Sequence, residues 1–131
     1  MNAIRSLFDD KNDGSPQVLI GDLNTGPSLP MFDIDPEFAD QQQLLVDDGW
    51  VGANNNSESP FCTWCPSSNP NAALADLENN LIDQILVRNA QTSDPRRIFD
   101  ELVTVTTPEG SSDVYLSDHY GSQASVTYRP K

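Results

Sequence analysis

The residues QVLIGDLN (17–24) decide the fold that this sequence predicts. Residues 17–21 form a short apolar run that contains β-branched Val18 and Ile20 and is bounded by turn-forming residues, a pattern typical of a strand buried on both faces. A strand of this kind needs neighbouring strands and covering layers. The next residues, Asp22 and Asn24, are then expected to project from the end of the strand, where a loop begins.

The segments around this strand predict helices. Apolar residues at three-to-four spacing within residues 3–8 indicate the end of an amphipathic helix. Asp35 followed by Pro36 resembles an N-cap with proline at the first helical position, so a helix is expected to run from there through residues 38–45. It should end near Asp48-Gly49.

The C-terminal part of the chain is richer in strand signals. Residues 53–60 are turn and loop material, and a short strand is expected at 61–64. Residues 102–106 are β-rich, and residues 123–129 alternate apolar and polar side chains, as in a half-buried antiparallel strand.

One segment gives two conflicting predictions. Apolar residues fall on one helical face across residues 73–87, yet residues 82–87 alternate as they would in a strand. From periodicity alone, both structures remain open.

The charge balance excludes several classes of function. The chain has 131 residues with 7 Lys and Arg against 20 Asp and Glu, a net charge of −13. Because binding to phosphate backbones depends on basic side chains, and Arg96-Arg97 is the only basic cluster, direct binding to nucleic acid or anionic membranes is not expected. No apolar run is long enough to cross a bilayer, and residues 1–5 lack the start of a signal peptide.

Cys62 and Cys65 form the only cysteine motif, Cys-Thr-Trp-Cys. Without a second Cys or His pair at a metal-like spacing, a structural zinc site is not expected. A redox-active pair would stand at the start of a helix, whereas residues 66–70 are rich in proline and serine. A local disulfide or two small buried thiols remain as alternatives.

Three short motifs contain side chains suited to catalysis or metal binding. They are residues 21–24 (Gly-Asp-Leu-Asn), residues 82–85 (Ile-Asp-Gln-Ile) and residues 116–120 (Leu-Ser-Asp-His-Tyr). The third motif holds the only histidine of the sequence. Taken singly they indicate a strand-to-loop turn, a solvated helix face and a loop. Taken together and in this order, they resemble the endonuclease/exonuclease/phosphatase superfamily, whose deoxyribonuclease I-like and sphingomyelinase-like members are metal-dependent phosphodiesterases.

The resemblance implies a fold class, α/β, with residues 1–131 forming the C-terminal half of a single domain. That domain is a two-sheet α/β sandwich, the deoxyribonuclease I-like four-layer fold. The absent N-terminal half normally supplies a glutamate metal ligand, another asparagine and a second histidine. The resemblance also favours a strand at 82–87, and it implies that an isolated half-domain is marginally stable or prone to aggregation, because a sheet face and strand edges are exposed.

The resemblance also implies residue roles. Asp22 would orient or deprotonate the attacking water or help to bind a second metal, and Asn24 would donate to a non-bridging phosphate oxygen. His119 would contact the scissile phosphate, while Asp83 accepts a hydrogen bond from its other ring nitrogen and favours the protonated ring. Asp118 would be the metal ligand, which suits Mg²⁺ or Mn²⁺.

These expectations describe a hydrolase, a divalent-metal-dependent phosphoesterase that is inactive as this fragment. The alternative is a non-catalytic acidic half-domain that acts as a binding module or is a relic. The expected partners are the missing N-terminal half and a phosphoester substrate, which is left open among nucleic acid, sphingolipid, inositol phosphate and others. Localisation is left open between cytoplasm and secretion, since a targeting signal would lie in the missing part.

Overall fold

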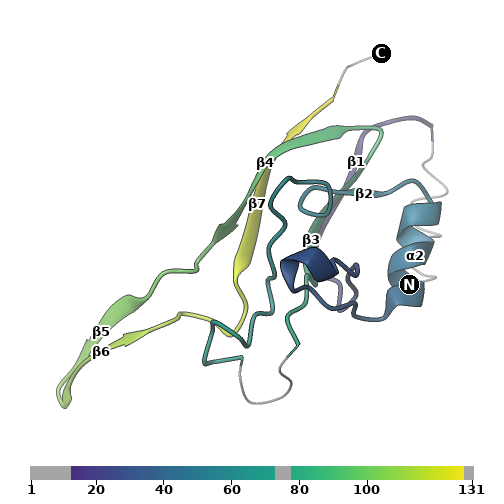
Figure 1. Ribbon diagram of the computed structural model, residues 1–131. Coiled ribbons are helices and arrows are strands. Elements are labelled where there is room, and N and C mark those ends of the chain that lie inside the picture. Colours follow the sequence, from purple (N-terminus) through teal and green to yellow (C-terminus); the bar gives the residue numbers. More distant parts are fainter. Residues whose placement is uncertain (1–12, 73–77, 129–131) are drawn as a thin grey trace.

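The computed structural model describes residues 13–72 and 78–128 (Figure 1). β-structure makes up 42% of these residues and helix 11%. The predicted helix within residues 3–8 lies outside the described residues. The elements in chain order are β1 (Gln17–Asp22), the 3₁₀ helix η1 (Pro30–Phe32), α2 (Ala39–Asp47), β2 (Val51–Gly52), β3 (Asp83–Arg88), β4 (Gln91–Ile98), β5 (Val103–Thr107), β6 (Gly110–Val114) and β7 (Gly121–Thr127).

The first sheet has the strand order β1-β3-β2, and both pairs are antiparallel. The predicted strand at residues 17–21 is therefore confirmed, but the prediction that both of its faces are buried is wrong. Val18 is 40% and Ile20 is 68% exposed. The reason is position in the sheet: β1 is an edge strand, and its packing against the core involves the opposite face, where Leu19 lies.

The core on that face is small. Leu45 of α2 packs with Trp50 and with Leu86 of β3, and the half-buried Leu19 and Leu23 lie against this cluster. Figure 1 shows α2 beside the strands of this sheet.

A buried pair of amides joins α2 to β3. Each side-chain amide nitrogen of Gln42 and Gln84 donates to the other's oxygen, at 3.4 and 3.0 Å. Both side chains are at least 94% buried, so the reciprocal bonds remove the cost of burying two amides and fix how the helix sits on the strand.

The helix ends where the sequence predicts and begins later than predicted. At the C-terminus, Gly49 has φ +81° and its N–H donates to the Val46 carbonyl, which is the stop typical of glycine. At the N-terminus, α2 starts at Ala39. Asp35 does not cap the helix because its backbone N–H donates to the Asn79 carbonyl, at 2.7 Å, which draws this segment toward the start of β3.

The conflict over residues 82–87 is resolved in favour of the strand, since β3 runs from Asp83 to Arg88. β3 is hydrogen-bonded on both sides, to β1 and to β2, so backbone groups that a helix would satisfy internally are satisfied by neighbouring strands. The helical periodicity spans residues 73–87, and its first part, residues 73–77, lies outside the described residues.

The C-terminal strands form two separate two-stranded sheets, β4-β7 and β5-β6. The predicted strand at 102–106 is present as β5, and residues 123–127 of the strand predicted at 123–129 lie in β7, which is antiparallel to β4 as expected. Tyr128 follows the strand, and Arg129 lies outside the described residues. Val126 and Tyr128 are exposed, so the expected half-buried face is not formed there. The sequence pattern does not predict β4. This strand contains Pro95, which lies in a register shift between Ser93 and Arg96, where no ladder hydrogen bond is needed. The β5-β6 hairpin is exposed along almost its whole length and projects from the rest of the molecule (Figure 1).

The expected fold class, the α/β C-terminal half of a two-sheet, four-layer sandwich, is wrong for the described residues. Such a sandwich needs helices that cover the outer faces of two large sheets. The described residues contain a single α-helix, nine residues long, and sheets of three, two and two strands. One short helix can cover only one sheet face, so the layers cannot be built. Among the described residues, no helix combines the length and apolar character needed to cross a membrane.

Candidate functional site

The last residue of β1 and the first residue of β3 place two carboxylates side by side. Asp22 lies directly opposite Asp83 in the antiparallel register, and beyond them the N–H of Leu23 donates to the Ile82 carbonyl at 2.9 Å. Directly opposite residues share a sheet face, and two like charges there repel each other. The pair is therefore suited to a positively charged partner.

His119 reaches this pair from the loop before β7. Its Nδ1 lies 2.7 Å from Oδ2 of Asp83, with the histidine 25% and the aspartate 24% exposed. Nδ1–H donates to the carboxylate, an arrangement that fixes the tautomer and orientation of the ring. Nε2 is the ring nitrogen left for a ligand or substrate.

Asp22, Asp83 and His119 together form a group that can hold a metal ion. Each offers one ligand atom, and these atoms all lie within 4.8 Å of one another. Asp22 is exposed and the other two are half-buried, so the group is open to solvent on one side. We call this group the Asp22 cluster.

Asn24 stands at the edge of a cleft beside the cluster. Its backbone N–H donates to Oδ1 of Asp22 at 2.9 Å, and its φ of +46° is a left-handed conformation that asparagine tolerates better than most residues. The cleft has a volume of about 230 Å³ and is lined by Asn24, Glu37, Trp64, Glu78, Asn80, Ile82 and His119.

Asp118 is not brought into the cluster, although it was the expected metal ligand. Its exposed carboxylate accepts from the hydroxyl of Ser117 at 3.3 Å, and that same hydroxyl oxygen accepts from the backbone N–H of His119 at 3.1 Å. The fully buried Asn69 donates to the carbonyls of Ser117 and Asp118 at 2.9 and 3.3 Å. These bonds hold the loop so that His119, and not Asp118, meets Asp83.

Two residues that the sequence did not single out form part of this site. Trp64 lies against His119, with ring centroids 5.1 Å apart at 60°, and it forms backbone bridges with Asn80 and His119 in place of the expected strand at 61–64. Thr63, its neighbour, is completely buried. The available signal was their position inside Cys-Thr-Trp-Cys, where a closed loop would fix both.

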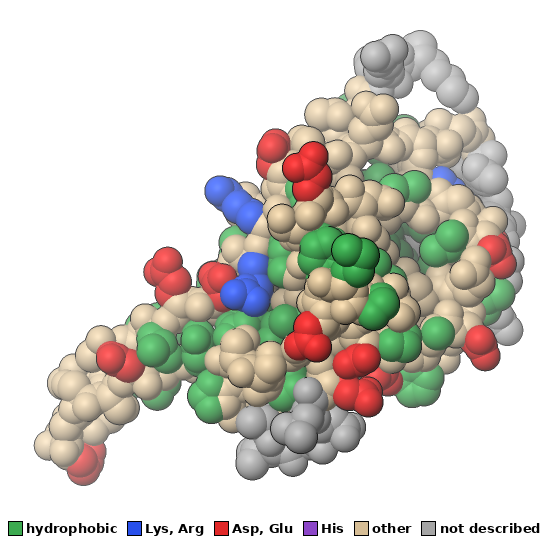
Figure 2. Space-filling model, in the orientation of Figure 1, with side chains coloured by type: hydrophobic (Ala, Val, Ile, Leu, Met, Phe, Trp, Pro, Cys, Tyr) green, Lys and Arg blue, Asp and Glu red, His purple; other side chains and the backbone are tan. Residues whose placement is uncertain are grey.

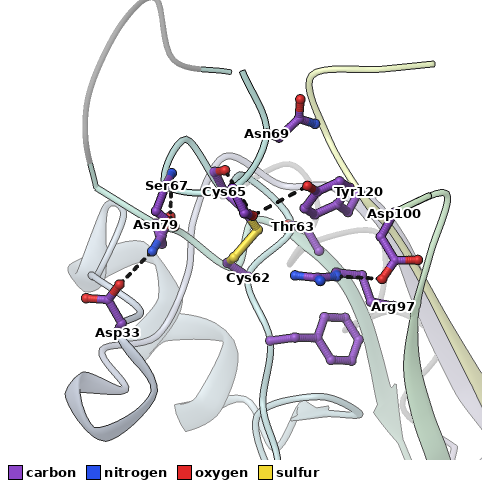
Figure 3. Close-up of a disulfide and its surroundings, with 12 residues drawn as sticks. Asp33, Cys62, Thr63, Cys65, Ser67, Asn69, Asn79, Arg97, Asp100 and Tyr120 are labelled. Carbon is purple, nitrogen blue, oxygen red and sulfur yellow. Dashed lines mark hydrogen bonds and ion pairs between the residues drawn. A yellow bond between two sulfur atoms is a disulfide. The ribbon is translucent and has the colours of Figure 1, made fainter. Parts of the chain in front are cut away.

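Cys62 and Cys65 form a disulfide (Figure 3). Of the two alternatives left by the sequence, the local disulfide is therefore confirmed, and not the pair of small buried thiols. Cys65 is completely buried. The bridge closes the short loop that carries Thr63 and Trp64.

The residue after His119 is anchored in the interior. Tyr120 is 2% exposed, and the Arg97 guanidinium lies 4.5 Å from the centre of its ring while also pairing with Asp100 at 3.0 Å (Figure 3). The hydrogen bond to Tyr120 raises the pKa of Tyr115 above its ordinary value. This packing keeps the loop that carries His119 close to β4.

Acidic side chains are spread over the face shown in Figure 2. Most of the basic atoms visible there lie where the hairpin joins the body, and they belong to arginines because no lysine is among the described residues. The strand that leads into this region, β4, carries Arg96 and Arg97. Among the described residues, the visible face thus offers no continuous basic path for a nucleic-acid backbone.

Comparisons of the chain with protein-family models, with curated proteins and with solved structures give no match.

Proposed function

We propose that this chain carries part of the active site of a divalent-metal-dependent phosphoesterase. The observation that supports the proposal is the convergence of Asp22, Asp83 and His119 within 4.8 Å, from segments far apart in the sequence. The three motifs that resemble those of the endonuclease/exonuclease/phosphatase superfamily supply all three residues. The proposal concerns the chemistry of the site and not the four-layer fold.

The residues divide the work of phosphoester hydrolysis. His119 is oriented by Asp83 and, when both ring nitrogens carry a proton, presents Nε2–H to the phosphate as a general acid or as a hydrogen-bond donor to developing charge. Asp22 accepts a proton from, or orients, the attacking water. Asn24 donates its amide to a non-bridging phosphate oxygen, which stabilises the charge that grows in the transition state.

The donor set fits a hard divalent cation. The carboxylates of Asp22 and Asp83 would hold it, since oxygen ligands suit Mg²⁺ and Mn²⁺. The metal, when bound, neutralises phosphate charge and lowers the pKa of a bound water.

A second candidate function, a cation-binding module without catalysis, is favoured by the cleft. Glu37 and Glu78 line it beside Asn24 and His119. Two carboxylates raise the cost of bringing in an anionic phosphate unless a cation compensates them. Metal binding is common to both functions, and only hydrolysis separates them.

Metal binding by this chain is the first test. We expect Mn²⁺, followed by the paramagnetic resonance signal of the free ion, to bind with an affinity that Asp22→Asn and Asp83→Asn each lower by about 10- to 100-fold. Asp118→Asn and the matched control Asp113→Asn, an exposed residue of the projecting hairpin, should leave the affinity unchanged. Equal effects of all four substitutions would mean that the acidic surface binds Mn²⁺ without a site, and an effect of Asp118→Asn alone would refute the Asp22 cluster.

Hydrolysis is the second test. The resemblance assigns a glutamate, an asparagine and a second histidine to an N-terminal half, so we expect turnover of bis(p-nitrophenyl) phosphate with Mg²⁺ or Mn²⁺ from a polypeptide that also carries these residues. Metal binding without hydrolysis by that longer polypeptide would favour the binding module.

A further inference from the structure

Thr63 lies at the junction of the two segments that carry Asp83 and His119. Its side chain is completely buried, and its Oγ1 accepts two backbone hydrogen bonds, from the N–H of Ile82 at 3.2 Å and from the N–H of Asp83 at 3.0 Å. A single hydroxyl oxygen therefore fixes the backbone at the start of β3, where the Asp83 side chain begins.

The backbone of Thr63 fixes the other segment. Its carbonyl accepts from the N–H of Tyr120, the residue after His119, at 2.8 Å, and its own N–H donates to the Asn80 carbonyl at 2.9 Å. The next residue, Trp64, lies against the His119 ring.

The loop that contains Thr63 is closed by the Cys62–Cys65 disulfide, and Figure 3 shows Thr63 between this bridge and Tyr120. One further bond ties the two segments, from the hydroxyl of Ser122 to the Asp83 carbonyl at 3.1 Å. Thr63 is the residue that bonds directly to Asp83 and to the neighbour of His119.

We infer that Thr63 is a positioning residue that sets the geometry of the Asp83–His119 pair. A hydrogen bond of 2.7 Å between side chains on separate elements needs both backbones to be held in register, and Thr63 binds both. The catalytic consequence of this inference rests on the proposed phosphoesterase function, whereas the structural consequence does not.

The test uses the fact that the chain has one histidine, so its imidazole NMR signals need no assignment among several rings. In the wild-type chain, we expect the Nδ1–H proton of His119 to be shifted downfield and protected from exchange by Asp83. Thr63→Val keeps the shape but leaves two backbone N–H groups without their acceptor, and it should broaden or abolish this signal. Thr63→Ser keeps the oxygen and should restore it.

A second buried threonine provides the matched control. Thr25 is also completely buried, and its hydroxyl bonds to the carbonyls of Glu37 and Phe38, not to Asp83 or Tyr120. Thr25→Val should lower stability while leaving the His119 ring signal in place. A folded Thr63→Val chain with an unchanged ring signal would overturn the inference, and so would equal loss of the signal in Thr25→Val.

If Thr63→Val does not fold, hydrogen exchange in the wild-type chain decides. The amide N–H of Asp83 and the ring Nδ1–H of His119 should become exchangeable at the same concentration of denaturant, and separate opening of the two would refute the inference. In a longer polypeptide that hydrolyses phosphodiesters, Thr63→Val should lower kcat about 10- to 100-fold with KM little changed. Absence of hydrolysis by that longer polypeptide without the Thr63 substitution would reject the proposed function and leave the NMR result standing.

Discussion

The Asp83–His119 hydrogen bond assigns different tasks to two neighbouring side chains. The carboxylate accepts from Nδ1 and therefore controls which nitrogen of the ring faces the cleft, while the ring itself can touch a substrate. Removing the ring should therefore lower turnover more than weakening the hydrogen bond that orients it.

We predict that, in a polypeptide that hydrolyses phosphodiesters, turnover falls more when the His119 ring is removed than when its hydrogen bond to Asp83 is weakened. His119→Gln should lower kcat by about 10²- to 10⁴-fold, the range of a general acid, with KM nearly unchanged. Asp83→Asn keeps the ring and should lower kcat by about 10- to 100-fold. Steady-state kinetics at saturating Mn²⁺ measure both, and near-normal turnover of His119→Gln would refute the role given to the ring.

At the scale of the elements, the conformation of the loop after β1 depends on Gly26, which lies close to the backbone of Leu81. Gly26 exchanges hydrogen bonds with Glu37, N–H to carbonyl in both directions, at 2.8 and 3.3 Å. A Cβ at Gly26 would overlap the carbonyl oxygen of Leu81. Glu37 lines the cleft beside Asn24, so this close approach also shapes the candidate site.

Gly26→Ala is therefore expected to lower the free energy of unfolding by about 1–3 kcal/mol, because the obstructing atoms belong to the backbone and cannot rotate away. Gly121→Ala is the matched control: its Cβ would lie 2.8 Å from the side chain of Ile98 and 3.0 Å from that of Phe99, which can move. Urea denaturation of both variants should show the larger loss for Gly26→Ala. A smaller loss there would contradict this account of the loop.

The disulfide loop should matter more for the position of the site than for global stability. The bridge joins residues only 3 apart, so it constrains the unfolded chain little, by about 2 kcal/mol or less. We expect the Cys62→Ser, Cys65→Ser double variant to melt slightly earlier than the wild type and to shift the His119 ring signals.

Thiol titration of the denatured wild-type chain should find no free thiol before reduction and two after it, since no cysteine is free in the described residues. Unchanged His119 signals in the double variant would show that the hydrogen bonds of Thr63 hold the loop without the bridge.

At the scale of the whole molecule, the described residues combine a small apolar core with several exposed apolar side chains. The core cluster has three buried members, Leu45, Trp50 and Leu86. Val18 and Ile20 are exposed on an edge strand, an arrangement that favours pairing with another chain.

We therefore predict that the isolated chain is marginally stable and self-associates through β1. Ile20→Lys should reduce self-association in sedimentation velocity experiments, because a charged residue on an edge strand opposes strand pairing. Met31→Lys, at a side chain that is 91% exposed outside the sheets, adds the same charge and should have little effect. A monomeric wild-type chain with a cooperative melt well above room temperature would contradict the prediction.

The sequence determined the local structures in which neighbouring residues agree. The apolar run at 17–21 forms β1, Asp48-Gly49 ends the helix, and the alternating residues at 123–127 lie in a strand. Each rests on short-range causes, namely β-branched side chains, a glycine with positive φ and two-residue periodicity. The motifs also predict Asp22, Asp83 and His119 as site residues.

Only the tertiary structure decided which of these features meet. Periodicity could not separate helix from strand at residues 82–87, because the answer depends on hydrogen bonds to β1 and β2, which are remote in the sequence. The same limit applies to the layers: motifs report where a strand ends in a loop, but the number of sheets and helices depends on long-range packing, so the four-layer expectation was wrong. The sequence also could not show which of two adjacent residues, Asp118 or His119, joins the site. His119 reaches Asp83, whereas the carboxylate of Asp118 accepts a hydrogen bond from Ser117. Adjacent residues point in different directions, and the buried contacts of Thr63 and Asn69 select which one joins the site.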